Sequence, residues 1–223
     1  MNKLYLNLKK HYKKRIEKRH FVLMEEIKDY GTKNVVVFDI DDTLLTAQNI
    51  FIHRKLPTDK EVVKLTPQEF AHEKITQESK QYYSYDEFCD EKKVYGSIVD
   101  GIPLVKNLRI LDANLRANYE LMILTARGME DVIYKALKKW LMYIDVDGEF
   151  KNIGDKLKRE NVFAINDKKG YVGATDFEKK SNVLKEIAKE YDLVKFIDDD
   201  KKNINAVKDM NIKNIQVISA WGE

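Results

Sequence analysis

Residues 35–45 read VVVFDIDDTLL, and this stretch decides the fold. It begins with three β-branched residues and a phenylalanine, the composition of a short parallel strand that is buried on both faces. Carboxylates follow at once, at Asp39, Asp41 and Asp42. Parallel sheets bind ligands beyond the carboxyl ends of their strands, so we expect these side chains to lie at a functional edge of a sheet.

Four later apolar runs repeat this pattern, over residues 121–124, 162–165, 194–197 and 215–218. The first three of them lead directly to polar residues, which are Thr125, Asn166 and Asp198. Between the runs, apolar residues spaced three or four apart predict helices, beginning at Leu104, Val132 and Val183. Alternating strands and helices predict an α/β fold with a doubly wound, Rossmann-like parallel sheet.

The segment 46–101 interrupts this alternation. Within it, Thr66-Pro67-Gln68-Glu69 predicts a helix start, because Thr caps, Pro fits the first turn and Glu reaches back to the cap. We therefore expect a core over 31–45 and 102–223, and an insert over 46–101 that forms a small cap or flap after the first core strand. The insert either overhangs the crevice and selects substrates, or packs its aromatic residues into a small core of its own.

Residues 1–30 predict a basic amphipathic helix, with lysines and arginines between regularly spaced apolar residues. Such a helix either binds phosphate backbones or anionic lipid, or packs on its own domain with its charged side in solvent. The whole chain has 40 basic and 37 acidic residues, a net charge of +3, which commits it neither to nucleic acid nor to a membrane.

Cysteine usage and hydropathy bear on the compartment. Cys89 is the single cysteine, which excludes an internal disulfide and a multi-cysteine zinc site. No apolar run approaches the roughly 20 residues of a membrane span, and the N-terminus lacks the apolar core of a secretory signal. We therefore expect a cytoplasmic protein.

The clustered carboxylates indicate a cation. Asp39 and Asp41 would point the same way in an extended strand. Two like charges about 4 Å apart repel by roughly 4 kcal/mol at an effective dielectric near 20, so one keeps its proton or a cation lies between them. Asp198, Asp199 and Asp200 add carboxylates at another strand end, and oxygen ligands without His or Cys suit Mg²⁺. Taken alone, this second run is also typical of a capped helix start.

The motifs resemble those of the haloacid dehalogenase superfamily. Residues 36–45 are similar to its first signature, a hydrophobic strand followed by Asp-x-Asp-x-Thr. Thr125 with its preceding apolar run resembles the second motif, Lys180 the third, and Asp198-Asp199 the fourth, all in the family's order. The resemblance covers about residues 35–218, apart from most of the insert. It implies a Rossmann-like core and a Mg²⁺-dependent phosphatase.

The resemblance also implies catalytic roles. Asp39 would be the nucleophile that forms an aspartyl-phosphate, and Asp41 would protonate the leaving oxygen and then activate water. Thr125 would donate a hydrogen bond to a phosphoryl oxygen, and Lys180 would offset negative charge. Lys179 is an alternative to Lys180, but apolar residues three and four positions after Lys180 favour the latter.

Metal and substrate contacts follow from the same resemblance. The metal would be held by Asp39, by the main-chain carbonyl of Asp41 and by Asp199. Asp198 would support Asp199 as a hydrogen-bond acceptor or cap the next helix. Thr43 would brace the loop beside the substrate phosphate.

Three positions leave questions open. Asp42 stands where glycine is frequent in the family, and Asn203 where many members carry a further aspartate, so the resemblance does not extend to the complete set of metal ligands. Thr125-Ala126-Arg127 resembles the phosphatase domain of polynucleotide kinase-phosphatases, in which the arginine contacts the substrate phosphate. This resemblance implies a polynucleotide 3′-phosphatase as one subclass. The alternative for Arg127 is an ion pair with a local carboxylate.

The expected partner is a phosphorylated substrate, either a small molecule or a nucleic-acid end. Two other classes of function compete with the phosphatase. One is a nucleic-acid-binding or partner-binding module that acts through the N-terminal helix. The other is a phospho-accepting receiver domain, which chain order disfavours because receivers carry the accepting aspartate on a later strand.

Overall fold

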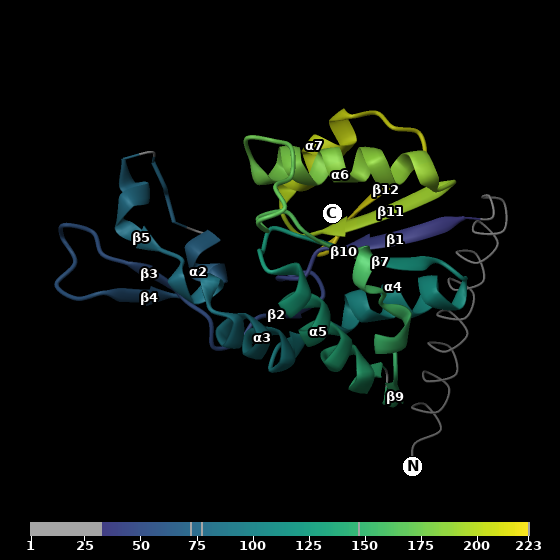
Figure 1. Cartoon of the computed structure of the whole chain (residues 1–223), viewed down its shortest axis with the longest axis horizontal. Helices are drawn as coiled ribbons and strands as arrows, with labels where there is room; N and C mark the ends of the chain where they lie inside the picture. Colours follow the sequence, from purple (N-terminus) through teal and green to yellow (C-terminus); the bar gives the residue numbers. More distant parts are fainter. Residues whose placement is uncertain (1–32, 72, 77, 147, 223) are drawn as a thin grey trace, which may run out of the picture.

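The computed structural model describes residues 33–222 apart from 72, 77 and 147, so the helix predicted over 1–30 lies outside the described residues. A five-stranded sheet with all neighbours parallel forms the centre, in the order β10-β7-β1-β11-β12 (Figure 1). Its strands are β1 (Asn34–Phe38), β7 (Glu120–Thr125), β10 (Val162–Ala164), β11 (Leu193–Asp198) and β12 (Ile215–Ser219). The prediction of an α/β fold with these five strands is confirmed.

Helices cover both faces of the sheet (Figure 1). On one face lie α3 (Glu91–Val99), α4 (Val105–Arg116) and α5 (Glu130–Trp140), and on the other lie α6 (Asp176–Glu190) and α7 (Lys201–Asp209). Alternate residues of β1 serve the two cores: Val36 and Phe38 pack in the core beneath α4 and α5, whereas Val35 and Val37 pack in the core beneath α6 and α7. Burial of β1 on both faces explains its unbroken apolar sequence.

Strand order places the acidic residues together. From β1 the chain passes outward through β7 to β10, and then returns to β11 on the opposite side of β1. Such a reversal opens a crevice at the carboxyl ends of the strands. Asp39 directly follows β1, Asp198 is the last residue of β11, and Thr125 is the last residue of β7. The topology therefore gathers residues distant in sequence at one edge.

Apolar periodicity does not predict helix α7, and only the alternative interpretation of the aspartate run as a capped helix start indicates it. Its apolar face rests on only two buried residues, Ile204 and Val207, which is too little for a periodic signal. It begins after Asp200, whose carboxylate accepts a hydrogen bond from the backbone of Lys202 at 2.8 Å. The helix-capping interpretation of the aspartate run is thus confirmed for Asp200 alone.

The insert leaves and re-enters the core through a pair of short strands, β2 (Leu45–Thr46) and β6 (Ile102–Pro103). Beyond them a small antiparallel sheet projects from the core (Figure 1). Phe70 packs edge-on against Tyr83 and Tyr85, with ring centroids 5.5 Å apart in each pair. The insert thus has an aromatic cluster of its own. The projecting elements are β3 (Ile52–Arg54), β4 (Val63–Leu65), β5 (Tyr83–Ser84) and α2 (Pro67–Ala71).

The predicted helix start in the insert is confirmed. Glu69 accepts a hydrogen bond from the Thr66 backbone at 2.8 Å, and the Thr66 hydroxyl accepts one from the Glu69 backbone at 3.2 Å.

Helix α3, at the end of the insert, belongs to the core and not to the projecting sheet, because Val94 and Ile98 pack in the same core as α4 and α5. Among the described residues, the remaining elements are the hairpin β8 (Ile144–Val146) and β9 (Glu149–Lys151), and five short 3₁₀ helices: η1 (Ser79–Tyr82), η2 (Asp86–Cys89), η3 (Leu141–Tyr143), η4 (Gly154–Lys156) and η5 (Arg159–Asn161).

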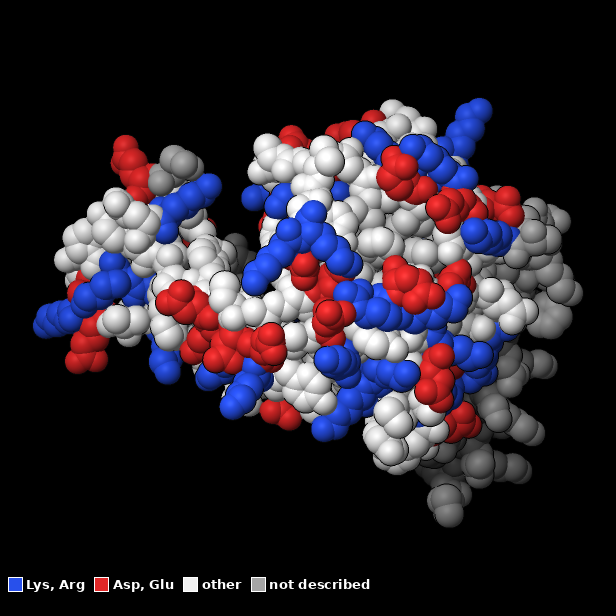
Figure 2. All heavy atoms as spheres, viewed as in Figure 1, with Lys and Arg blue, Asp and Glu red and all other residues white. Residues whose placement is uncertain are grey.

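The surface carries charges of both signs. On the face seen in Figure 2, basic and acidic side chains are interspersed over the core and the insert. This distribution agrees with the nearly balanced composition. Within the described part of the chain, no helix combines the length and the apolar character that a membrane crossing requires.

Glu120, at the start of β7, binds side chains from three other places in the chain, and its ionisation makes the free energy of unfolding depend on pH. It accepts hydrogen bonds from Lys158, Asn161 and Tyr191 at 2.6, 3.0 and 2.6 Å. Burial acts to raise the pKa of Glu120, but these donors outweigh it and lower the pKa to about 2.

A folded-state pKa below the ordinary value means that the ionised carboxylate stabilises the fold above about pH 4.5 and that this contribution is lost as the pH falls towards 2. We expect Glu120→Gln to lower the free energy of unfolding by about 1–2 kcal/mol at pH 7. The difference from wild type should shrink below pH 4.5. Urea unfolding of both proteins from pH 3 to pH 7 measures this, and a difference that does not change with pH contradicts the assignment.

Candidate active site

The centre of the site is a buried lysine between two carboxylates. The Lys180 ammonium, on the first turns of α6, lies 2.9 Å from Asp39 Oδ1 and 2.8 Å from Asp198 Oδ2. All three side chains are at least nine-tenths buried. Lys179 points elsewhere and donates to Asn166 Oδ1. The structure therefore brings Lys180, and not Lys179, to Asp39.

Burial and charge govern ionisation in this cluster. Burial works to lower the pKa of the Lys180 amine, but Asp39 and Asp198 outweigh it and raise that pKa above its usual value. Lys180 is therefore charged. For Asp39, burial is the largest influence and raises the carboxyl pKa well above its usual range, Lys180 opposes this, and the other carboxylates of the site add to it. One lysine does not compensate the carboxylates gathered here.

A third carboxylate completes an acidic group. Oxygen atoms of Asp39, Asp198 and Asp199 lie within 4.8 Å of one another. Burial, reinforced by Asp198, raises the pKa of Asp199 to about 6. The Thr43 hydroxyl, fully buried, donates to Asp199 Oδ1 at 3.2 Å. Thr43, expected to brace the loop beside the phosphate, thus contacts an acidic residue on the neighbouring strand end.

Asp198 is the most fully bonded carboxylate of the group. Besides Lys180, it accepts hydrogen bonds from the backbone of Asp200 at 2.9 Å and from the Asn203 amide at 3.0 and 3.1 Å. A further aspartate at position 203 would face Asp198 with like charge, whereas asparagine donates to both of its oxygens. The asparagine at position 203 therefore has a local physical reason, and Asp199 is left with the freer carboxylate.

Asp41 faces away from this group and towards Arg127. Arg127 Nε and Nη2 donate to the two oxygens of Asp41 at 2.7 Å each, a bidentate pair, and Nη1 donates to the Ser97 hydroxyl at 3.0 Å. The arginine side chain is 4% exposed and that of Asp41 27%. Burial acts to lower the pKa of Arg127, but Asp41 outweighs it and raises the pKa. The ion pair with a local carboxylate is thus present, and its partner is Asp41.

The two remaining loop residues also have defined roles. Thr125 is buried, and its hydroxyl accepts a hydrogen bond from the Arg127 backbone at 3.3 Å. Asp42 has a φ of 53°, in the left-handed region where glycine is favoured and aspartate is tolerated. Its Oδ1 accepts hydrogen bonds from Thr46 at 3.2 Å and from Gln68 of the insert at 2.7 Å. Asp42 therefore links the carboxylate loop to the insert.

Sequence reasoning missed three residues that support the site. Ser97 anchors Arg127, Gln68 binds Asp42, and the buried Asn107 amide donates to the Thr43 carbonyl at 2.8 Å. Ser97 and Asn107 interrupt the apolar faces of helices that are otherwise buried, at positions next to Val94 and Leu108 in the helical pattern. A polar residue on such a face is a usable signal, because burial without a partner is costly. Gln68 carries no comparable signal.

These observations define a class of protein: an α/β protein with a parallel sheet and a buried acidic cluster at the carboxyl ends of its central strands. Residues 18–218 match the family model described as Protein of unknown function (DUF2608), so the chain belongs to that family. Comparisons with curated proteins and with solved structures gave no match.

Proposed function

We propose that this protein is a Mg²⁺-dependent phosphatase of the haloacid dehalogenase type, which hydrolyses a phosphate monoester through an aspartyl-phosphate on Asp39. The observation that carries the proposal is the convergence of Asp39, Lys180 and Asp199 at one strand edge from three distant parts of the chain. Each has the side chain that its role requires. The order of the motifs along the chain agrees with the same family.

The acidic group suits a divalent cation. Its donors are carboxylate oxygens within 4.8 Å of one another, which are the hard ligands that Mg²⁺ prefers. The raised pKa values of Asp39 and Asp199 indicate carboxylates short of positive charge. Asp39, Asp199 and the Asp41 carbonyl would hold Mg²⁺, with Asp198 supporting them. When bound, Mg²⁺ would supply positive charge to the carboxylates and to a phosphate oxygen.

The side chains perform the rest of the reaction. Asp39 attacks phosphorus while the bond to the leaving oxygen breaks. Asp41, once it has turned from Arg127 and taken up a proton, donates that proton to the leaving oxygen. A water molecule then attacks the aspartyl-phosphate, Asp41 takes its proton, and Asp39 and inorganic phosphate are released. Thr125 and Lys180 stabilise the charge that develops on the phosphoryl oxygens. Arg127 holds the Asp41 carboxylate in one orientation and, through Ser97, couples it to α3.

The direct test is phosphate release from a generic aryl phosphate. We expect release by the full chain with Mg²⁺, abolished by EDTA and restored when Mg²⁺ is added in excess. The rate of phosphate release by the same protein without added Mg²⁺ is the baseline. Release that is absent with Mg²⁺, or that EDTA leaves unchanged, refutes the proposal.

A further inference from the structure

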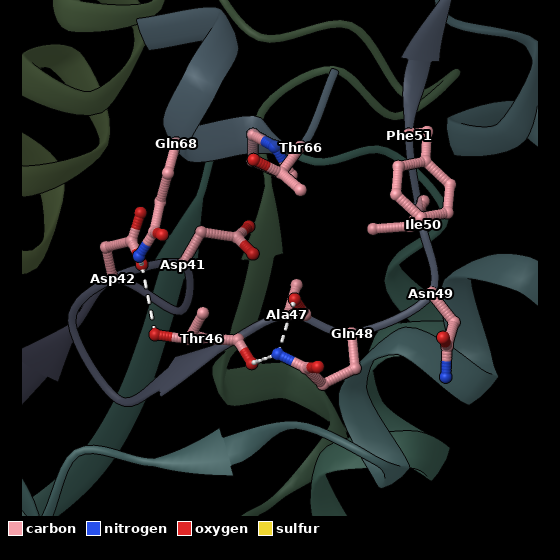
Figure 3. A pocket seen from close by; sticks show the side chains of 11 residues that line it. Asp41, Asp42, Thr46, Ala47, Gln48, Asn49, Ile50, Phe51, Thr66 and Gln68 are labelled. Atoms are coloured by element: carbon pink, nitrogen blue, oxygen red, sulfur yellow. Dashed lines mark hydrogen bonds between the residues drawn. The ribbon is translucent and has the colours of Figure 1, made fainter. Parts of the chain in front are cut away.

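A cavity of about 180 Å³ lies between the carboxylate loop and the insert. Figure 3 shows Asp41 and Asp42 on one side of it and Ile50 and Phe51 on the other, with Thr66 and Gln68 at the insert end. The cavity begins at the carboxylate of Asp41, the proposed proton donor to the leaving oxygen. If the proposed function holds, the group attached to that oxygen occupies this cavity.

The charge of the lining restricts what enters. Asp41 and Asp42 line the cavity, and none of its lining residues is Lys, Arg or His. Lys64 lies outside the lining, with its ammonium 5.7 Å from the centroid of the Phe51 ring. Proteins that hold nucleic-acid ends surround the neighbouring phosphates with lysine and arginine. A second phosphate would here meet carboxylates instead.

The polar groups of the lining match hydroxyls. Thr46 and Gln68 bind Asp42 through Oδ1, and among the described residues no hydrogen bond reaches its Oδ2. Gln48 and Asn49 also line the cavity, and Gln48 Nε2 donates to the carbonyls of Thr46 and Ala47 at 3.3 and 3.2 Å, which leaves its amide oxygen as an acceptor. Amides both donate and accept, and a carboxylate oxygen accepts, which is the mixture that a polyhydroxylated ligand satisfies.

The size and the shape of the cavity also indicate a small ligand. A cavity of about 180 Å³ is smaller than the roughly 300–1,000 Å³ of pockets that bury drug-sized ligands. Phe51 offers an apolar surface opposite the carboxylates, as Figure 3 shows. We propose that the leaving group is a small, uncharged, hydroxyl-rich alcohol, a sugar or another polyol, which Asp42 and Gln68 select. This inference rests on the proposed phosphatase function and argues against the polynucleotide 3′-phosphatase subclass.

The experiment compares kcat/KM of the full chain for hexose, pentose and glycerol monophosphates with that for a 3′-phosphate oligonucleotide, nucleoside monophosphates, phosphoethanolamine and an aryl phosphate. The sugar or polyol phosphates should give the highest values. Gln68→Ala and Asp42→Asn should lower kcat/KM for them by about tenfold more than for the aryl phosphate, which corresponds to one lost hydrogen bond. Gln81→Ala, an exposed amide elsewhere in the insert, is the matched control.

Two results overturn the inference while leaving the phosphatase intact: a higher kcat/KM for the oligonucleotide, a nucleotide or phosphoethanolamine, or equal losses on all substrates in the Gln68 and Asp42 variants. Failure of the phosphatase itself looks different, because no substrate, including the aryl phosphate, then releases phosphate. In that case calorimetric binding of a hexose phosphate to the full chain still decides the inference. Binding weakened about tenfold by Gln68→Ala supports it, and no binding, or binding unaffected by the substitution, overturns it.

Discussion

Asp39→Asn is expected to lower kcat for an aryl phosphate by roughly 10³-fold or more, the size of effect seen when a nucleophile is removed from a catalytic group that acts as a unit. In the proposed mechanism the amide cannot form the aspartyl-phosphate, so the two-step route is lost. The fold should survive, because Lys180 keeps its contact with Asp198 at 2.8 Å and the amide oxygen can still accept from the lysine.

Asp209→Asn is the matched control, since Asp209 is exposed at the last residue of α7, the helix end opposite to the one that follows the acidic residues 198–200. It should retain wild-type kcat. Circular dichroism and thermal unfolding of the Asp39 variant separate lost chemistry from lost structure. An Asp39→Asn protein that is folded and still releases phosphate at more than a tenth of the wild-type rate would rule out Asp39 as the nucleophile.

The sheet could be predicted from sequence because its central strands, β1, β7 and β11, are buried on both faces. Each of the five strands carries a short, mainly apolar run, which Lys195 interrupts in β11 and Gln216 in β12. The clearest is β1, with Val35, Val36, Val37 and Phe38 all fully buried. Elements that bury less escaped prediction. The strands β3, β4 and β5 have only two or three residues each, and neither their length nor their mixed polarity distinguishes them from loop.

The chemistry-bearing residues could be named from their motifs, but their partners could not. Asp41 and Arg127 are separated by 86 positions, and the pairing of their side chains depends on how β1 and β7 lie side by side. Likewise, the contact between Gln68 and Asp42 depends on how the insert folds back over the loop. Sequence spacing predicts contacts within one helix or strand, whereas these contacts depend on tertiary packing.

The direction in which the Asp41 side chain points also could not be predicted from sequence spacing. Extended geometry would have pointed Asp39 and Asp41 to the same side. The strand ends at Phe38, however, and the following turn directs Asp39 to Lys180 and Asp41 to Arg127. Repulsion between the two carboxylates is thus relieved by two separate cations from opposite faces of the sheet. No pattern in the motif itself carries this information.

Replacing Lys180 with methionine is expected to lower the free energy of unfolding by roughly 3–5 kcal/mol, because it leaves Asp39 and Asp198 buried without their cation. The side chain of Lys180 is 1% exposed, so water cannot take its place without opening the core. Lys179→Met, at the neighbouring half-buried position, is the matched control and should cost less than about 1 kcal/mol, because it removes only the contact with Asn166. Urea unfolding of both variants at neutral pH measures the difference.

A double-mutant cycle then assigns the cause. If the loss arises from unpaired carboxylates, Asp198→Asn should cost less in the Lys180→Met background than in wild type, because the charge it removes is already uncompensated there. Strict additivity, or a Lys180→Met protein as stable as Lys179→Met, would mean that the lysine does not hold the two strand ends together. The two carboxylates come from β1 and β11, on either side of the point where the strand order reverses. A single lysine therefore joins the two halves of the sheet at the place where the reaction is proposed to occur.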